Sequence, residues 1–223
     1  MAFTGLAGCG ASELIQTMFG ALPEEGGRML VNGNGRPLHG SIVRFMKNSV
    51  AMVASNRKEN SVVPDMTILE NFYLAEHEIS RGKKPFINKK QEASRYEEQK
   101  ESLHIKAESY DDGILSLSGG NQQKVFLARW LNTGADVLLL DNPTQGVDVG
   151  AKEEIYKLIL GFAEAGKTVI INTLEIPEIK KVADRCIVFY EGGIIKIFRN
   201  EEVNEHDVML YSTNAIQTSK EAM

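Results

Sequence analysis

The sequence predicts an α/β fold with a mostly parallel sheet and an inserted helical segment. Short, continuously apolar runs at 137–140, 168–172 and 186–190 alternate with amphipathic helical stretches. This alternation is typical of parallel strands that helices cover on both faces. A glycine-rich loop at 5–12 follows the first apolar run, whereas the pattern between about 65 and 132 is mostly helical. We therefore expect one α/β core that a helical segment at 65–132 interrupts.

The N-terminal elements follow from local patterns. Residues 2–7 predict a short strand that enters the glycine loop, and a helix from Ser12 to Ala21 should begin with its serine as N-cap. Strands are expected at Arg28–Asn32 and at Ser49–Ala54, with a helical stretch at 40–47 between them.

The C-terminal elements are equally regular. Residues 151–165 predict an amphipathic helix that ends at the glycine following it, and a second helix is expected at 176–183. A turn at 191–193 should lead into a strand at 194–198. The polar tail from about residue 200 is expected to fray.

Composition narrows the class of protein. The 223 residues suffice for one sizeable core, and 43% hydrophobic with 25% charged residues is typical of a globular protein. The net charge of −5 does not favour a nucleic-acid partner. No apolar run approaches the roughly 20 residues of a membrane span, and the N-terminus lacks the features of a signal peptide. Cys9 and Cys186 are expected to be reduced, as in a cytosolic protein, although the sequence alone leaves a disulfide open.

Two segments carry the chemistry. Residues 117–124 read LSGGNQQK, and residues 137–141 read VLLLD. A glycine pair at a helix N-terminus lets backbone N–H groups approach a phosphate, and the helix dipole favours an anion there. Ser118 can cap the helix or bond a phosphate oxygen, while an ordinary serine cap is the alternative for Ser-Gly-Gly alone. Asp141 ends a buried strand, where P-loop ATPases hold Mg²⁺.

These segments together resemble the signature and Walker B motifs of ATP-binding cassette (ABC) proteins. The NQQK extension resembles one branch of the family, the ATPases of bacterial sugar and nucleoside importers. The resemblance runs over essentially the whole chain and implies a single ABC nucleotide-binding domain over 1–223, with 65–132 as its helical signature subdomain. The family's upstream antiparallel strands are lacking, so we expect a fragment of a longer protein, namely the second cassette of a tandem ATPase.

The resemblance also assigns a phosphate loop. It fits G-x-x-x-x-G-K-[ST], except that Ala11 stands where the family has lysine. The loop backbone remains, and Ser12 with Asp141 would bind Mg²⁺. Loss of one charged hydrogen bond is worth about 1.5–3 kcal/mol, so weak binding of Mg-ATP is expected. The nucleotide-binding residues implied are Gly5, Gly8, Cys9, Gly10, Ala11 and Ser12.

Other positions depart from the family pattern. Asn142 stands where the family has the glutamate that polarises the attacking water, and general-base assistance is typically worth ~10²–10⁴ in rate. Leu174 stands where a switch histidine is expected, and the four histidines at 39, 77, 104 and 206 are assigned no role. In the loop at 50–58, only Arg57 matches the pattern of the importer branch. Asp148 matches the family's D-loop aspartate.

The distribution of these departures suggests a division of labour. In the family, two cassettes sandwich ATP head to tail, so Ser118, Gly119, Gly120 and Gln122 would serve the nucleotide that the partner cassette holds. The sequence leaves open whether this chain hydrolyses ATP itself. The expected function is the ATP-binding subunit of an importer for simple sugars. The alternatives are a nucleoside importer or an orphan cassette that acts as scaffold or regulator.

The resemblance implies partners and a location. The partners would be a second cassette and membrane permease subunits, with a solute-binding protein reached only indirectly. The expected location is the cytoplasm, peripheral to the inner face of the cell membrane through the permease. The tandem cassette proteins of the ribosome fit poorly, because this chain is acidic and lacks their basic linker.

Overall fold

A computed structural model describes residues 1–31, 40–81 and 86–215. Within them the strands form one six-stranded sheet in the order β2-β3-β4-β1-β5-β6. Every pairing is parallel except that of β5 with β6, which is antiparallel. The strands are β1 (Ala2–Thr4), β2 (Val50–Val53), β3 (Val137–Asp141), β4 (Thr168–Asn172), β5 (Arg185–Tyr190) and β6 (Gly193–Arg199).

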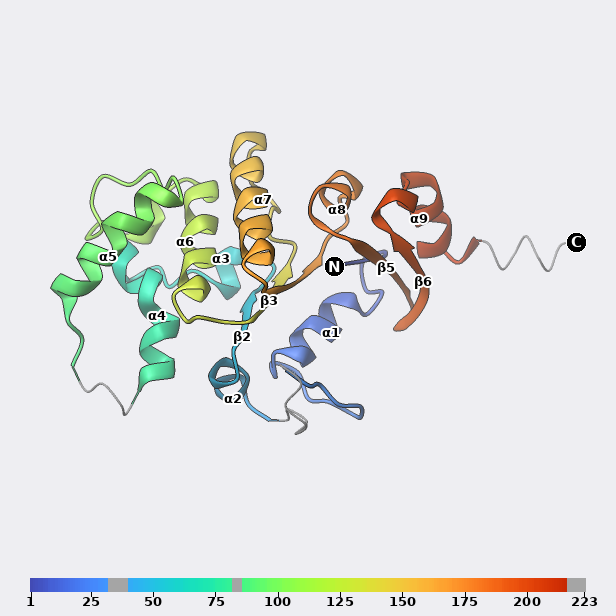
Figure 1. The fold of residues 1–223 in the computed structure, drawn as a ribbon, viewed down its shortest axis with the longest axis horizontal. Coiled ribbons are helices and arrows are strands. Elements are labelled where there is room, and N and C mark those ends of the chain that lie inside the picture. Colours follow the sequence, from blue (N-terminus) through green and yellow to red (C-terminus); the bar gives the residue numbers. More distant parts are fainter. Residues whose placement is uncertain (32–39, 82–85, 216–223) are drawn as a thin grey trace, which may run out of the picture.

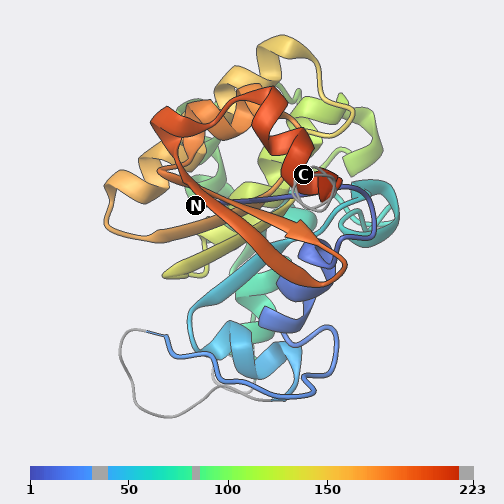
Figure 2. The same ribbon diagram turned by 90° about the vertical axis from the view of Figure 1, so that its right-hand side faces the viewer.

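Helices cover both faces of this sheet. In Figure 1, α1 and α2 lie below the sheet, and α7, α8 and α9 lie above it. The view from the β6 edge shows the same two layers (Figure 2). These helices are α1 (Ala11–Met18), α2 (Ile42–Lys47), α7 (Val149–Glu164), α8 (Ile176–Val182) and α9 (Glu205–Ser212).

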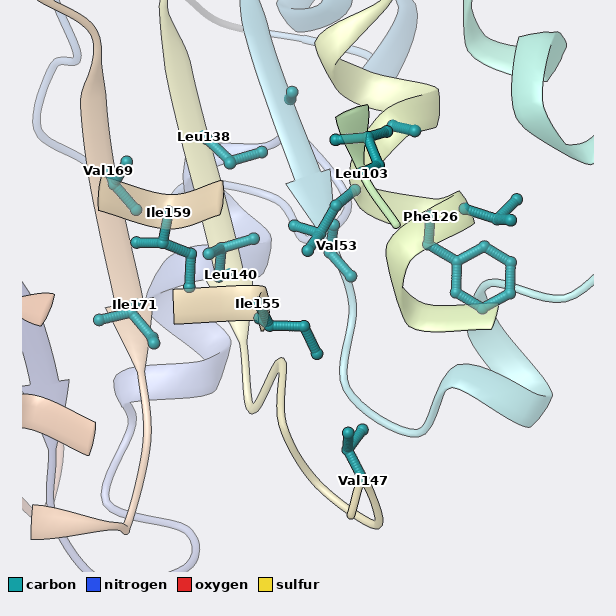
Figure 3. Close-up of a cluster of buried hydrophobic side chains, with 14 of the residues drawn as sticks. Val53, Leu103, Phe126, Leu138, Leu140, Val147, Ile155, Ile159, Val169 and Ile171 are labelled. Carbon is teal, nitrogen blue, oxygen red and sulfur yellow. The ribbon is translucent and has the colours of Figure 1, made fainter. Parts of the chain in front are cut away.

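The side chains of β3 alternate between the two layers, as the pleat requires. Leu138 and Leu140 belong to the cluster that includes Ile155 and Ile159 of α7 (Figure 3). Leu139 packs in the opposite cluster with Ile15 of α1. Because β3 is buried on both faces, its sequence is an uninterrupted apolar run.

The helical insertion lies between β2 and β3 in the chain, at the left of Figure 1. A buried arginine joins two of its helices. The Arg129 Nε of α6 donates to the Asn71 carbonyl of α4 at 2.7 Å, and one Nη donates to the Ser61 carbonyl at 2.9 Å. This contact fixes the direction of α6. The helices of the insertion are α3 (Arg57–Asn60), α4 (Ile68–Ser80), α5 (Lys89–Ser102) and α6 (Gly119–Leu131), with a 3₁₀ turn at Ile114–Ser116.

The α/β class, the parallel sheet and the helical insertion are confirmed, but three local predictions are wrong. Arg28–Asn32 forms no strand in its described part, 28–31, where only Met29 makes an isolated bridge and none of the six strands of the described sheet includes these residues. Ser12 does not cap α1, which begins at Ala11 after Gly10. The tail does not fray up to residue 215: a 3₁₀ turn at Asn200–Glu202 precedes α9, and the Asn204 side chain accepts from the backbone N–H of Asp207.

None of the helices in the described residues is long and apolar enough to cross a membrane. Cys9 and Cys186 are both free, as expected.

Candidate functional site

The glycine-rich loop lies where β1 ends, at the carboxyl edge of the parallel sheet. Gly10 adopts a φ of 97°, a conformation that glycine tolerates best. A Cβ at Gly10 would lie 2.9 Å from the Cα of Gly192. The Gly192 N–H donates to the carbonyl of Cys9 at 2.9 Å. The turn between β5 and β6 therefore holds the loop closely and excludes larger side chains at residue 10.

The sheet register brings Ser12 to Asp141. Asp141 is fully buried at the end of β3, and the Ser12 Oγ donates to its Oδ2 at 2.6 Å. Its Oδ1 accepts from the Asn172 Nδ2 at 2.7 Å and from the Asn142 Nδ2 at 3.2 Å. The Gln16 Nε2 donates in turn to the Ser12 Oγ at 3.2 Å. Each oxygen of the buried carboxylate thus has a donor.

This arrangement suits a magnesium ion. Mg²⁺ prefers oxygen ligands and commonly binds through one or two carboxylates together with substrate phosphates. The Ser12 hydroxyl and the Asp141 Oδ2 are adjacent oxygens at the end of the phosphate loop. These two residues would hold the ion. No group of three or more His, Cys, Asp or Glu side chains elsewhere in the described residues could hold a metal.

Residues 11, 142 and 174 carry uncharged side chains. Ala11 is 1% exposed and packs in the apolar cluster that contains Ile15. Asn142, with a φ of 48°, is tied to its neighbours through its amide and through its N–H, which donates to the Asn172 carbonyl at 2.8 Å. Leu174 is 60% exposed.

The signature segment forms the predicted helix start. Ser118 is the N-cap of α6, and its Oγ accepts from the Asn121 Nδ2 at 3.0 Å. Gly119 and Gly120 begin the helix. The Gln122 side chain is buried and donates from Nε2 to the Leu117 carbonyl at 3.0 Å. It supports the turn before the helix.

The signature end of α6 lies against the start of α7. A Cβ at Gly120 would lie 2.5 Å from the Cβ of Ala151 and 3.5 Å from the Asp148 Oδ2. Asp148 is the N-cap of α7, and its Oδ1 accepts from the Ala151 N–H at 3.0 Å. The proposed D-loop aspartate and the signature glycines therefore lie side by side within this chain.

Two residues that support the site or its surroundings are not predicted by the sequence. Asn172 could have been found, since it ends a strand next to the one that Asp141 ends and pairs with it in register. Lys124 is 2% exposed and pairs with Glu154 of α7 at 2.8 Å, a contact that no local signal indicates. The Arg57 side chain and the whole of His39 lie outside the described residues. His77 contacts Glu92 at 2.7 Å in the helical insertion.

Comparison with known proteins decides the family. The family model described as ABC transporter matches residues 1–145. The chain belongs to the ABC transporter family. Among solved structures, it is similar to a dimeric ATP-binding cassette in a post-hydrolysis state bound to ADP and Pi, with a TM-score of 0.75 and 22% identity over 89% of this chain and 84% of that one. A nucleotide-free ATP-binding cassette from an ABC transporter gives a TM-score of 0.75 at 23% identity, over 89% of this chain and 79% of that one. These structures share the ABC cassette fold.

Curated relatives of this ABC chain are import ATP-binding proteins. The ribose import ATP-binding protein RbsA of Halalkalibacterium halodurans is 35% identical over 96% of this chain and 42% of its own length. The galactose/methyl galactoside import protein MglA of Clostridium tetani is 34% identical over 95% and 42%. The arabinose import protein AraG of Vibrio parahaemolyticus is 35% identical over 92% and 40%. This ABC chain thus spans about two fifths of each relative.

Proposed function

We propose that this chain is an ATP-binding cassette of a bacterial ABC importer for simple sugars. In this proposal its signature segment completes the ATP site of a second cassette, and its own site hydrolyses ATP poorly or not at all. Relatives named for ribose, galactose and arabinose import, at about 35% identity over nearly the whole chain, support the sugar class.

One contrast carries the proposal. Ser118 is exposed at the start of α6, where it is followed by the half-buried Gly119 and by Gly120, which is buried against Ala151. At the chain's own phosphate loop, by contrast, residue 11 presents only a buried methyl group and residue 142 an amide. In this proposal the serine that would act on another cassette's nucleotide is present, while the lysine and the glutamate expected at the chain's own site are lacking.

The chain's residues have separate parts in this mechanism. At its own site, the loop backbone would bind phosphate, and Ser12 with Asp141 would hold Mg²⁺. The ion supplies positive charge that stabilises the phosphoryl oxygens. Asn142 cannot accept a proton from water, so this site lacks a general base at that position. At the partner's site, the N-terminal N–H groups of α6 and the Ser118 hydroxyl would donate to phosphate.

The organisation of the whole protein belongs to the same proposal. The chain would be one nucleotide-binding domain over 1–223, with 65–132 as its signature subdomain. The relatives are more than twice as long as the segment matched, which leaves room for a second cassette in them. Head-to-tail pairing with such a cassette, contact with permease subunits and a peripheral position on the cytoplasmic face of the membrane complete the proposal.

ATPase measurements test the division of labour. We expect negligible hydrolysis by the purified chain and robust hydrolysis by its complex with an intact partner cassette. Ser118→Arg should abolish the activity of the complex, whereas Ser12→Ala should change it little. Ser102→Arg, at the exposed end of α5, is the matched control. Robust ATPase of the chain alone, or insensitivity to Ser118→Arg, would refute the proposal. An orphan cassette would instead fail to co-purify with a multi-span permease.

A further inference from the structure

A buried carboxyl group lies behind the loops that follow β3 and β4. Glu178, in the first turn of α8, is only 1% exposed. Its Oε1 accepts a hydrogen bond from the Thr144 Oγ1 at 3.0 Å. Its Oε2 is buried and has no hydrogen-bond partner among the described residues. A charged side chain in such a position is costly unless a specific interaction requires it.

The surroundings of Glu178 come from three elements. Burial raises the pKa of Glu178, and the nearby Thr173 and Thr144 hydroxyls oppose that rise. Tyr156 of α7 is also close, and burial, followed by the charge of Glu178, raises its pKa to about 12. The nearby charged groups are Glu175, Glu153 and Lys152. Of these, Lys152 pairs with Glu175 at 2.6 Å.

Thr144 and Thr173, the two threonines near Glu178, belong to the loops that follow β3 and β4 at the carboxyl edge of the sheet. Thr144 lies in the loop from Asn142 to Asp148, whose turn is closed by the Val147 N–H donating to the Thr144 carbonyl at 3.1 Å. Thr173 precedes Leu174, and its N–H donates to the Phe3 carbonyl at 3.1 Å. One carboxyl group therefore contacts both loops from the protein interior.

This contact extends to the signature segment. The 142–148 loop ends at Asp148, which caps α7, and the first turn of α7 touches Gly120 through Ala151. A shift of Thr144 would be transmitted along a short, closely packed path to the start of α6. Because tightly packed interiors transmit small displacements, a hydrogen bond that holds Thr144 in place also helps to hold the start of α6 in place.

We propose that Glu178 is a positioning residue that anchors the 142–148 loop through Thr144 and thereby sets Asp148 and the signature end of α6 against a nucleotide held by the partner cassette. The second half of this inference rests on the proposed function. The first half, the anchoring of the loop, does not.

Hydrogen exchange of the full chain tests the anchoring alone. Thr144→Val removes the hydroxyl but keeps the shape of the side chain, whereas Thr144→Ser keeps the donor. We expect the Val147 amide to exchange about tenfold faster or more in Thr144→Val, as the loss of one hydrogen bond to a charged group implies, and to stay near wild type in Thr144→Ser. Equal exchange in both variants overturns the proposal.

Steady-state kinetics of the complex test the second half. Thr144→Val should lower kcat about tenfold without changing KM for ATP, and Thr144→Ser should restore it. A KM change without loss of kcat, or no rescue by serine, overturns this half. Glu178→Gln, which keeps an acceptor oxygen but no charge, should lie between the two and replaces Thr144→Val if that variant does not fold. An inactive wild-type complex contradicts the proposed function, while the exchange result still decides the anchoring.

Discussion

Gly120 offers the sharpest test of how the signature segment is built. A methyl group at this position would lie 2.5 Å from the Ala151 Cβ, a distance at which one of the two must move. The next neighbours, the Asp148 Oδ2 at 3.5 Å and the Val147 Cγ1 at 3.6 Å, lie at ordinary contact distances. The obstruction is therefore a single methyl group, and Ala151→Gly should remove it.

The expected magnitudes follow from this geometry. Overpacking costs about 1–3 kcal/mol, while alanine gains up to ~1 kcal/mol over glycine within a helix. Gly120→Ala alone should therefore destabilise the chain by about 0–2 kcal/mol. Ala151→Gly should cost ~1 kcal/mol. In the double variant the helix preferences cancel and the clash is absent, so its stability should be close to wild type.

Urea unfolding of the four proteins measures this coupling. We expect a coupling energy of about 1–3 kcal/mol in favour of the double variant. Gly161→Ala is the matched control, since Gly161 lies within α7 and nothing lies within 4 Å of an added Cβ. That control should be neutral or stabilising. Additivity of the two single changes within about 0.5 kcal/mol would show that the contact is relieved without cost and would refute the reasoning.

Three further substitutions test buried polar contacts. Arg129→Met leaves the buried carbonyls of Asn71 and Ser61 without their donor. It should lower the free energy of unfolding in urea by about 2–5 kcal/mol, and Arg129→Lys should lower it by less. The hydrogen bond from Lys124 lowers the pKa of Glu154 below 4.5, so the stability lost in Glu154→Gln should be present above pH ~4.5 and vanish as pH falls through the lowered value. Burial raises the pKa of Glu178, so the contribution of this residue to wild-type stability falls as pH rises from ~4.5 through the raised value. Glu178→Gln lacks this titration, so its stability relative to wild type should increase over that range. Thermal unfolding between about pH 2 and pH 8 checks both, and parallel profiles for the two glutamine variants would contradict them.

The sequence predicts the framework of the fold because burial on both faces of a parallel strand leaves a local trace. The run at 137–141 is apolar for this reason, and the structure confirms it as β3. A strand also needs a neighbour, and that requirement leaves no local trace. The segment at Arg28–Asn32 shows this, since its residues favour a strand while its described part, 28–31, forms only the single bridge at Met29.

The candidate site shows the same limit for side chains. Position and residue type place Ser118 at a helix start, and the structure confirms it as the N-cap of α6. Ser12 is likewise a serine at the start of a predicted helix, yet its hydroxyl bonds to Asp141, which is 129 residues away in the chain. The bond of Thr144 to Glu178 likewise depends on how α8 packs behind the loop. Motifs mark where chemistry is located, whereas the partners of each side chain follow from the tertiary fold.

Asn142 and Ala11 are integrated into the protein around them, the first by hydrogen bonds and the second by apolar packing. A glutamate at 142 would place a second carboxylate beside Asp141, whereas the amide of Asn142 donates a hydrogen bond to that carboxylate. A lysine at 11 would need to leave an apolar cluster, whereas the methyl group of Ala11 completes it. In this chain residue 142 therefore supplies a donor to the Asp141 carboxylate, and residue 11 supplies an apolar contact. Under the proposed function, a glutamate introduced at 142 alone would place two carboxylates side by side before it created a catalytic centre, as expected of a cassette that contributes its signature segment to a partner.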